Sequence, residues 1–225
     1  FCFYKITYIW TVSKLKMNTR QIILDKALEM FNERGIEYVG LREIAAVLDI
    51  RVGNITYYFP TKDDLVYELS QQLSAANAAL IVAQKALTMH GFLQMLHKVY
   101  QNHIKFRCLL LSVVHLMQQN KHLAVTYKQT QQVRNATLKA NLQALEQGGY
   151  LKLKEENELV FLVSTLSLIS RFWISEAAIS LGQTHAAEQV QHYLLLVTQL
   201  FGPYCTAKGK REMEGFLKSG QNAMA

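Results

Sequence analysis

Residues 41–65 read LREIAAVLDIRVGNITYYFPTKDDL, and this stretch decides the fold of the N-terminal part of the chain. It begins with apolar side chains at helical spacing, namely Leu41, Ile44, Ala45 and Leu48. We expect Asp49 to turn the chain in the left-handed conformation, which Asp tolerates better than most residues other than Gly. A second short helix follows, and Pro60 ends it because proline disrupts helical hydrogen bonding. The pattern predicts a helix-turn-helix.

The second short helix has two different faces. Ile55 and Phe59 form an apolar face, whereas the opposite face carries charged, amide, hydroxyl and phenol groups. That exposed face consists of Arg51, Asn54, Thr56, Tyr57 and Tyr58. Such a helix fits the major groove of duplex DNA, where these groups can contact base edges or phosphates.

Capping residues predict a helix on each side of this motif. The preceding helix should begin at Asn18, with Gln21 completing a capping box, and should end at Gly35 in a left-handed cap. The following helix should begin at Thr61, with Asp64 in its third position. Three helices around one small core are therefore expected.

These residues together resemble the DNA-binding domain of the TetR-like (tetracycline-repressor) family. The resemblance rests on short motifs at fixed spacings: Ile23-Leu24, Ala27-Leu28, Phe31, Arg34-Gly35, Leu41-Arg42-Glu43-Ile44-Ala45, Gly53, Tyr58-Phe59 and Thr61-Lys62-Asp63-Asp64-Leu65. It covers roughly the first quarter of the chain after Met17, and many agreeing spacings make it more specific than a single short motif. The resemblance implies a transcription regulator whose second, more divergent domain is helical.

The exposed face and the resemblance give one set of candidate DNA-binding residues. They are Arg42, Arg51, Val52, Gly53, Asn54, Thr56, Tyr57, Tyr58 and Lys62. The positions of Arg42, Tyr58 and Lys62 contact phosphate in the proteins that this chain resembles. Gly53 would let the backbone approach DNA closely, and Val52 could contact a thymine methyl group. For any single residue, an ordinary exposed side chain is the alternative interpretation.

Three positions depart from the pattern of the family that the chain resembles. Gly40 stands where Ser or Thr is usual, Val52 where a polar residue is common, and Thr56 where an aromatic residue is frequent. These changes affect which operator sequence is read and leave the expected fold intact.

Composition indicates an all-α protein. Half of the 225 residues are hydrophobic, Pro occurs only twice, and long stretches follow the period of an α-helix. The predicted parts are an N-terminal extension (1–16), a helix-turn-helix DNA-binding domain (17–64) and a larger helical effector-binding and dimerisation domain (65–225). The extension reads as translated sequence before Met17, although its last two lysines could instead touch the DNA backbone.

The net charge of +7 does not by itself support DNA binding. Lys and Arg equal Asp and Glu in number up to Ser74, so the whole excess lies beyond that residue. The placement of Arg42, Arg51 and Lys62 supports DNA binding instead, because charges within a Debye length of the phosphates matter most.

Gly, Pro and Asn divide the remaining chain into helices. The predicted helices lie at about 75–89, 91–105, 106–119, 121–147, 155–181 and 184–201, with a short helix at Glu212–Leu217. Residues 159–181 are apolar on almost every side, so they must be covered on every side. We expect a homodimer in which 155–181 and 184–201 form a four-helix bundle with their copies, as in TetR-like proteins.

Large side chains in the second domain suggest an effector pocket. The candidates are Phe106, His115, Met117, Tyr127, Phe172 and Trp173. Ordinary core packing explains each of them equally well. Residues 121–139 carry Lys, Arg and His but no acid, which could attract an anionic effector, although a solvated basic face is the simpler explanation.

Nothing in the sequence indicates an enzyme. There is no His-Glu-x-x-His pair, phosphate-binding loop or nucleophile elbow, and we expect no metal ion and no cofactor. Three widely spaced cysteines fit the reducing cytoplasm. The apolar run Leu159–Ile174 is short for a membrane span, so no membrane partner is expected.

The function expected from the sequence is that of a homodimeric repressor. It would bind a pseudo-palindromic operator in double-stranded DNA and leave it when an unidentified small-molecule effector binds. The helix after Thr61 would link the two events, as the resemblance implies. A helical protein-interaction module without DNA binding is the alternative, and a steep salt dependence of DNA binding would distinguish the two.

Overall fold

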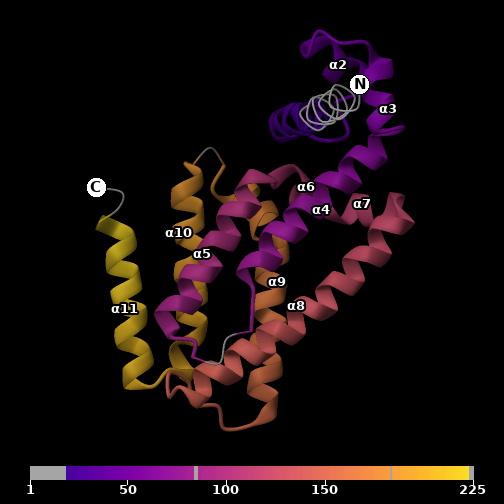
Figure 1. Ribbon diagram of the computed structural model, residues 1–225. Coiled ribbons are helices and arrows are strands. Elements are labelled where there is room, and N and C mark those ends of the chain that lie inside the picture. The colour runs from indigo at the N-terminus through magenta and orange to yellow at the C-terminus, as the bar shows by residue number, and fades with distance from the viewer. Residues whose placement is uncertain (1–18, 84–85, 183, 223–225) are drawn as a thin grey trace, which may run out of the picture.

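The computed structural model describes residues 19–83, 86–182 and 184–222, and Figure 1 shows their arrangement. The predicted extension and Asn18 lie outside these residues. The described residues form an all-α protein, as predicted. Its elements are a first helix over residues 19–34, α2 (Leu41–Val47), α3 (Val52–Tyr58), α4 (Lys62–Leu80), α5 (Met89–Lys105), α6 (Arg107–Leu111), α7 (Val113–Gln119), α8 (Lys121–Gln147), α9 (Glu156–Ser180), α10 (Ala186–Phe201), the 3-10 turn η1 (Gly202–Tyr204) and α11 (Ala207–Asn222).

Two hydrophobic cores organise these helices. The first helix, α2, α3 and the start of α4 enclose the smaller core, and we call this unit the head. The larger core, which we call the body, is built by α5 and α8 to α11. In Figure 1 the head lies at one end of the molecule, and α4 leads from it into the body. Because Leu65 and Leu69 are fully buried in the core of the head, α4 is anchored there as well.

Asn32 ties the head to the body. Its side-chain amide donates to the carbonyl of Lys105 (2.8 Å) and accepts from the backbone N–H of Cys108 (3.0 Å). These two bonds satisfy backbone groups at the junction of α5 and α6. Phe106 and Leu109 are buried in the core of the head. The body therefore contacts the head through α6 as well as through α4.

The prediction of a helix at 75–89 is wrong. α4 instead continues to Leu80, because the alanine-rich residues 75–79 favour helix and contain no Gly or Pro. Residues 81–83 and 86–88 lie outside the helices, and α5 begins after Thr88, whose hydroxyl accepts from the backbone N–H of Gly91 (3.0 Å).

The predicted helix at 106–119 is divided in two. Ser112, with φ −95° and ψ 9°, separates α6 from α7. α6 packs against α9, whereas α7 packs against α8, and one straight helix could not follow both partners. The short helix predicted in the tail is also longer than expected, because α11 packs on α5 and buries Met213 and Phe216.

α9 is long and apolar enough to cross a membrane, judged by length and composition alone. Core helices of globular proteins pass the same test. Here α9 packs against α5, α6, α8 and α10 within the body. Some of its apolar side chains remain exposed, among them Leu168 and Ile179.

Candidate DNA-binding surface and effector cavity

The turn between α2 and α3 has the geometry that the sequence predicts. Asp49 adopts φ +52°, which is the left-handed region. The backbone N–H of Ile50 then donates to the carbonyl of Ala45 (3.0 Å), which closes the turn. Ile44 and Ile55 are both fully buried, so the two short helices are held together by one apolar contact region. This packing leaves the polar face of α3 directed away from the core.

The residues predicted to bind DNA lie on α2, on α3 and at the start of α4. Most of them are exposed: Arg42, Arg51, Val52, Gly53, Asn54, Thr56 and Tyr57. The Tyr57 side chain is 67% exposed and contacts Tyr58 edge to face, with ring centroids 5.0 Å apart. Tyr58 is partly buried, so its ring is positioned by the head. The structure therefore brings the predicted residues together on one small unit.

Lys62 differs from the rest of this set. Its Nζ donates to the carbonyl of Ile36 (2.9 Å) and, more weakly, to that of Glu37 (3.4 Å). The ammonium group thus holds the loop between the first helix and α2. A phosphate contact by Lys62 would have to share these donors, so its role as a DNA contact stays a prediction.

Glu43 compensates for the missing side chain at Gly40. Gly40 offers no side-chain cap to α2, but its backbone N–H donates to the Glu43 carboxylate (3.4 Å). Arg34 forms an ion pair with the same carboxylate (2.7 Å), and this hydrogen bond lowers the pKa of Glu43. The end of the first helix and the start of α2 are thereby joined.

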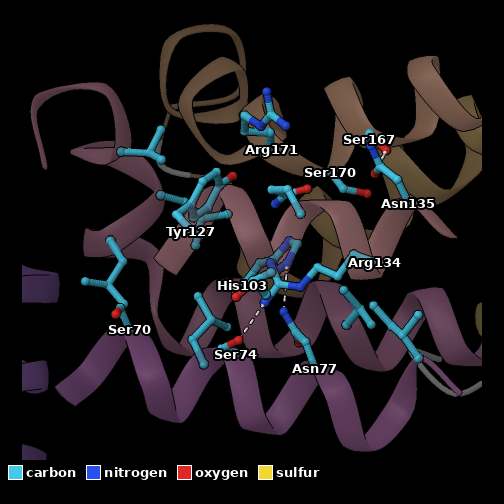
Figure 2. Close-up of a pocket in the computed structure, with 18 of the residues that line it drawn as sticks. Ser70, Ser74, Asn77, His103, Tyr127, Arg134, Asn135, Ser167, Ser170 and Arg171 are labelled. Atoms are coloured by element: carbon cyan, nitrogen blue, oxygen red, sulfur yellow. Dashed lines mark hydrogen bonds between the residues drawn. The ribbon is translucent and has the colours of Figure 1, made fainter. Parts of the chain in front are cut away.

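A cavity of about 140 Å³ lies among the helices α4 to α9, each of which contributes residues to its wall. Figure 2 shows its polar residues, with Ser70, Ser74 and Asn77 on α4. Of the predicted effector contacts, Met117 and Tyr127 line this cavity. The other four do not: Phe106 is buried in the head, His115 is exposed on α7, Phe172 is partly buried on α9, and Trp173 lies behind His103.

His103 forms the buried base of the cavity. The indole Nε1 of Trp173 donates to His103 Nδ1 (2.9 Å), and His103 Nε2 faces the side-chain amide of Asn77 (3.3 Å). Since an indole N–H can only donate, Nδ1 must be unprotonated. Burial lowers the pKa of His103 to about 3, and the positive charge of Arg134 lowers it further. His103 is therefore a neutral, fixed part of the wall.

The free energy of unfolding should depend on pH through His103. In the unfolded chain its pKa is near 6.5, whereas in the folded protein it is about 3. Between pH 6.5 and about pH 3 only the unfolded state takes up the proton. The free energy of unfolding is therefore highest above pH 6.5 and falls by about 1.4 kcal/mol for each unit that the pH drops toward 3. Urea unfolding of the protein and of His103→Gln at about pH 7 and about pH 5 measures this dependence. The free energy of unfolding of the variant should fall less between the two pH values than that of the parent protein. Equal losses in both proteins would assign the effect to other groups.

Arg134 is a cavity residue that the preferred sequence interpretation missed. That interpretation placed it on a solvated basic face, but it lines the cavity together with Tyr127, Thr130 and Leu138. A signal was available, because these residues and Leu123 recur every three or four positions along α8. Exposed Lys121 and Lys128 on the same helix do belong to a solvated face.

Comparison with known proteins identifies the family. One family model, described as a bacterial transcriptional repressor, matches residues 67–213, and a second, described as bacterial regulatory proteins of the tetR family, matches residues 23–69. The first model covers more than half of the chain. The chain belongs to the TetR family.

Solved structures share the fold of this TetR-family protein. A TetR-family transcriptional regulator from Marinobacter aquaeolei VT8 gives a TM-score of 0.81 at 21% identity, covering 89% of this chain and 98% of that one. SmeT, solved as a complex with triclosan, gives a TM-score of 0.60 at 14% identity, covering 84% and 93%. At these identities the likeness shows the fold alone.

A closer sequence match covers a shorter part of the chain. The probable HTH-type transcriptional regulator YttP of Bacillus subtilis (strain 168) is 36% identical over 55 residues, which are 24% of this chain and 27% of that protein. The match therefore spans about a quarter of the relative's length. Family membership makes the chain a DNA-binding transcriptional regulator of a non-enzymatic family, and this sets aside the alternative of an interaction module without DNA binding.

Proposed function

We propose that this TetR-family regulator is a homodimeric cytoplasmic repressor that a small-molecule effector releases from a pseudo-palindromic operator. The observation that carries the proposal is the course of α4. Its first turns are buried in the head, and its later residues Ser70, Ser74 and Asn77 line the cavity. A ligand that contacts these residues acts directly on the element that positions α3.

α6 gives the cavity a second connection to the head. Leu109 lines the cavity and also packs in the core of the head, and Asn32 binds the backbone at the start of α6. A ligand that shifts α4 and α6 would change the distance between the two heads of a dimer. DNA and ligand then weaken each other reciprocally, commonly by about 1–3 kcal/mol.

A dimer face is proposed on α9 and α10. α9 exposes Phe161, Leu168 and Ile179 at spacings that place them on one face, and α10 exposes Leu195 and Leu196. Large apolar patches of this kind mark interfaces, and a second copy covers both helices in a two-fold bundle. The two α3 helices would then enter major grooves about one helical turn or somewhat more apart.

Selection of bound duplexes from a random DNA pool tests the function. We expect an enriched sequence with two inverted half-sites, because a two-fold dimer reads both strands in the same way. Affinity for the selected duplex should fall steeply as the salt concentration rises, through release of counterions from the phosphates.

A scrambled duplex of the same length and composition is the control, and it should bind more weakly at every salt concentration. Enrichment of no sequence, together with equal affinity for both duplexes, would contradict the proposal.

A further inference from the structure

The cavity has an unusual balance of charge. Its wall contains two guanidinium groups, Arg134 and Arg171, and none of its lining residues is an acid. About half of the remaining lining side chains are apolar, among them Leu96, Val99, Leu109, Leu110, Val113 and Leu116. A positive group inside an apolar enclosure is costly unless a counter-charge accompanies it.

Arg134 lacks such a counter-charge. One terminal nitrogen donates to the hydroxyl of Ser74 (3.3 Å), and Figure 2 shows the side chain reaching from α8 toward that residue. Its Nε is buried without a hydrogen-bond partner. No carboxylate in the described part of the chain lies within ion-pair distance of it. Burial also lowers the pKa of Arg134, which shows how poorly its charge is solvated.

The groups around Arg134 cannot neutralise it. His103 is held neutral, and its one unprotonated ring nitrogen already accepts from Trp173. Ser74 supplies an oxygen dipole but no charge. The guanidinium of Arg134 lines the cavity and is left without a negative partner, which an anion in the cavity would supply.

Arg171 adds a second cation from α9. Its guanidinium lies 5.9 Å from the ring centroids of both Tyr127 and Phe172, and its Nε is also buried without a partner. The hydroxyls of Ser167 and Ser170 on the same helix also line the cavity. The polar part of the cavity is therefore cationic and rich in hydroxyl groups, whereas the rest is aliphatic.

From these contacts we infer that the effector is an amphipathic anion, a small molecule that joins one carboxylate or phosphate group to an apolar body. The anionic group binds Arg134, with Arg171 as the second cation, and the aliphatic wall receives the apolar body. The inference rests on the proposed effector role of this cavity and adds the chemical class of the ligand. A volume of about 140 Å³ favours a short or medium acyl chain.

Direct binding to the full chain tests the ligand class without DNA. The probes are butanoate, hexanoate, octanoate and decanoate, with octyl phosphate as the phosphate arm and 1-octanol as the uncharged match to octanoate. Isothermal titration calorimetry should show that octanoate or octyl phosphate binds roughly 10- to 100-fold more tightly than 1-octanol, because hydrogen bonds to charged groups are strong. Equal affinity for the anions and the alcohol, or no binding of any anion, overturns the inference.

Arg134→Leu removes the charge and keeps an apolar side chain, and Lys128→Leu removes an exposed cation from the same helix. Arg134→Leu should lose roughly 10- to 100-fold in affinity for the anion, whereas Lys128→Leu should bind like the parent protein. Without ligand, Arg134→Leu should melt at the same or a higher temperature, because an unpaired buried charge is removed. A lower melting temperature together with unchanged anion binding would assign Arg134 a purely structural role.

Operator release separates this inference from the proposed function. Addition of the best-binding anion should weaken binding to the selected operator in the parent protein and in Lys128→Leu, but not in Arg134→Leu. Anion binding that requires Arg134 but leaves operator affinity unchanged would uphold the ligand class and contradict the effector role. Operator release by 1-octanol alone would uphold the effector role and overturn the ligand class.

Discussion

Replacing Arg51 with alanine is expected to weaken operator binding by about 1–3 kcal/mol per half-site. In a two-fold dimer both half-sites lose the contact, so the total loss is about 2–6 kcal/mol if the half-sites contribute equally. Arg51 is exposed immediately before the first residue of α3, and no ion pair holds it within the described residues. Its guanidinium is thus available to a guanine edge or to a phosphate.

The measurement is fluorescence anisotropy with the selected duplex at fixed salt concentration. Arg211→Ala is the matched control, because Arg211 is exposed on α11 in the body and should not affect binding. The melting temperature should change little, since an exposed side chain is removed. Relaxed specificity at one base position would indicate base contact, and a uniform loss with a smaller salt slope would indicate phosphate contact. Full affinity in Arg51→Ala would remove Arg51 from the interface.

The head could be predicted from sequence because its structure depends on local patterns. The φ of +52° at Asp49 and the capping box of Thr61 with Asp64 both involve residues within one turn of each other. Ile44 and Ile55 lie only 11 positions apart and pack as the helical periodicity indicates. Capping, turn chemistry and apolar spacing all indicate the same structure here, and this agreement makes the structure of the segment predictable from its sequence.

The body was less predictable because contacts between distant residues shape it. The break between α6 and α7 accompanies packing on different partners, and Asn32 holds the start of α6 from 76 residues away. Likewise, Trp173 bonds to His103 across 70 residues, and no local pattern marks either residue. Tyr127 and Met117 were predicted to line a pocket and do so, but large side chains alone could not distinguish them from Phe106 or His115.

A helix shared by the head and the cavity connects these two parts of the protein. α4 carries Leu65 and Leu69 in the head and Asn77 at the base of the cavity. An anion bound at Arg134 would change the hydrogen bond that Arg134 donates to Ser74, which lies one turn from Asn77 on α4. The charge of the ligand and the position of the head would thus be connected through one helix. Coupling of this kind requires that the two heads be held in one dimer, since a free head could adapt to DNA without cost.

Replacing Leu168 with glutamate is expected to dissociate the dimer and to lower operator affinity by roughly 100- to 10,000-fold, because two linked heads bind with an avidity that one head lacks. Leu168 is 57% exposed on α9, on the face that also carries Phe161. A dimer would bury this side chain, and a buried carboxylate without a partner is strongly unfavourable. In a monomer the glutamate would remain hydrated, so the fold itself should be preserved.

Analytical ultracentrifugation and anisotropy with the selected duplex measure the two effects together. Val125→Glu is the matched control, because Val125 is similarly exposed on α8, on the side of that helix opposite to the cavity-lining Arg134. The control should remain dimeric and bind the operator like the parent protein. A Leu168→Glu protein that stays dimeric would place the interface elsewhere. A monomeric variant with full affinity would show that each head binds DNA independently, which would contradict control of operator binding by head spacing.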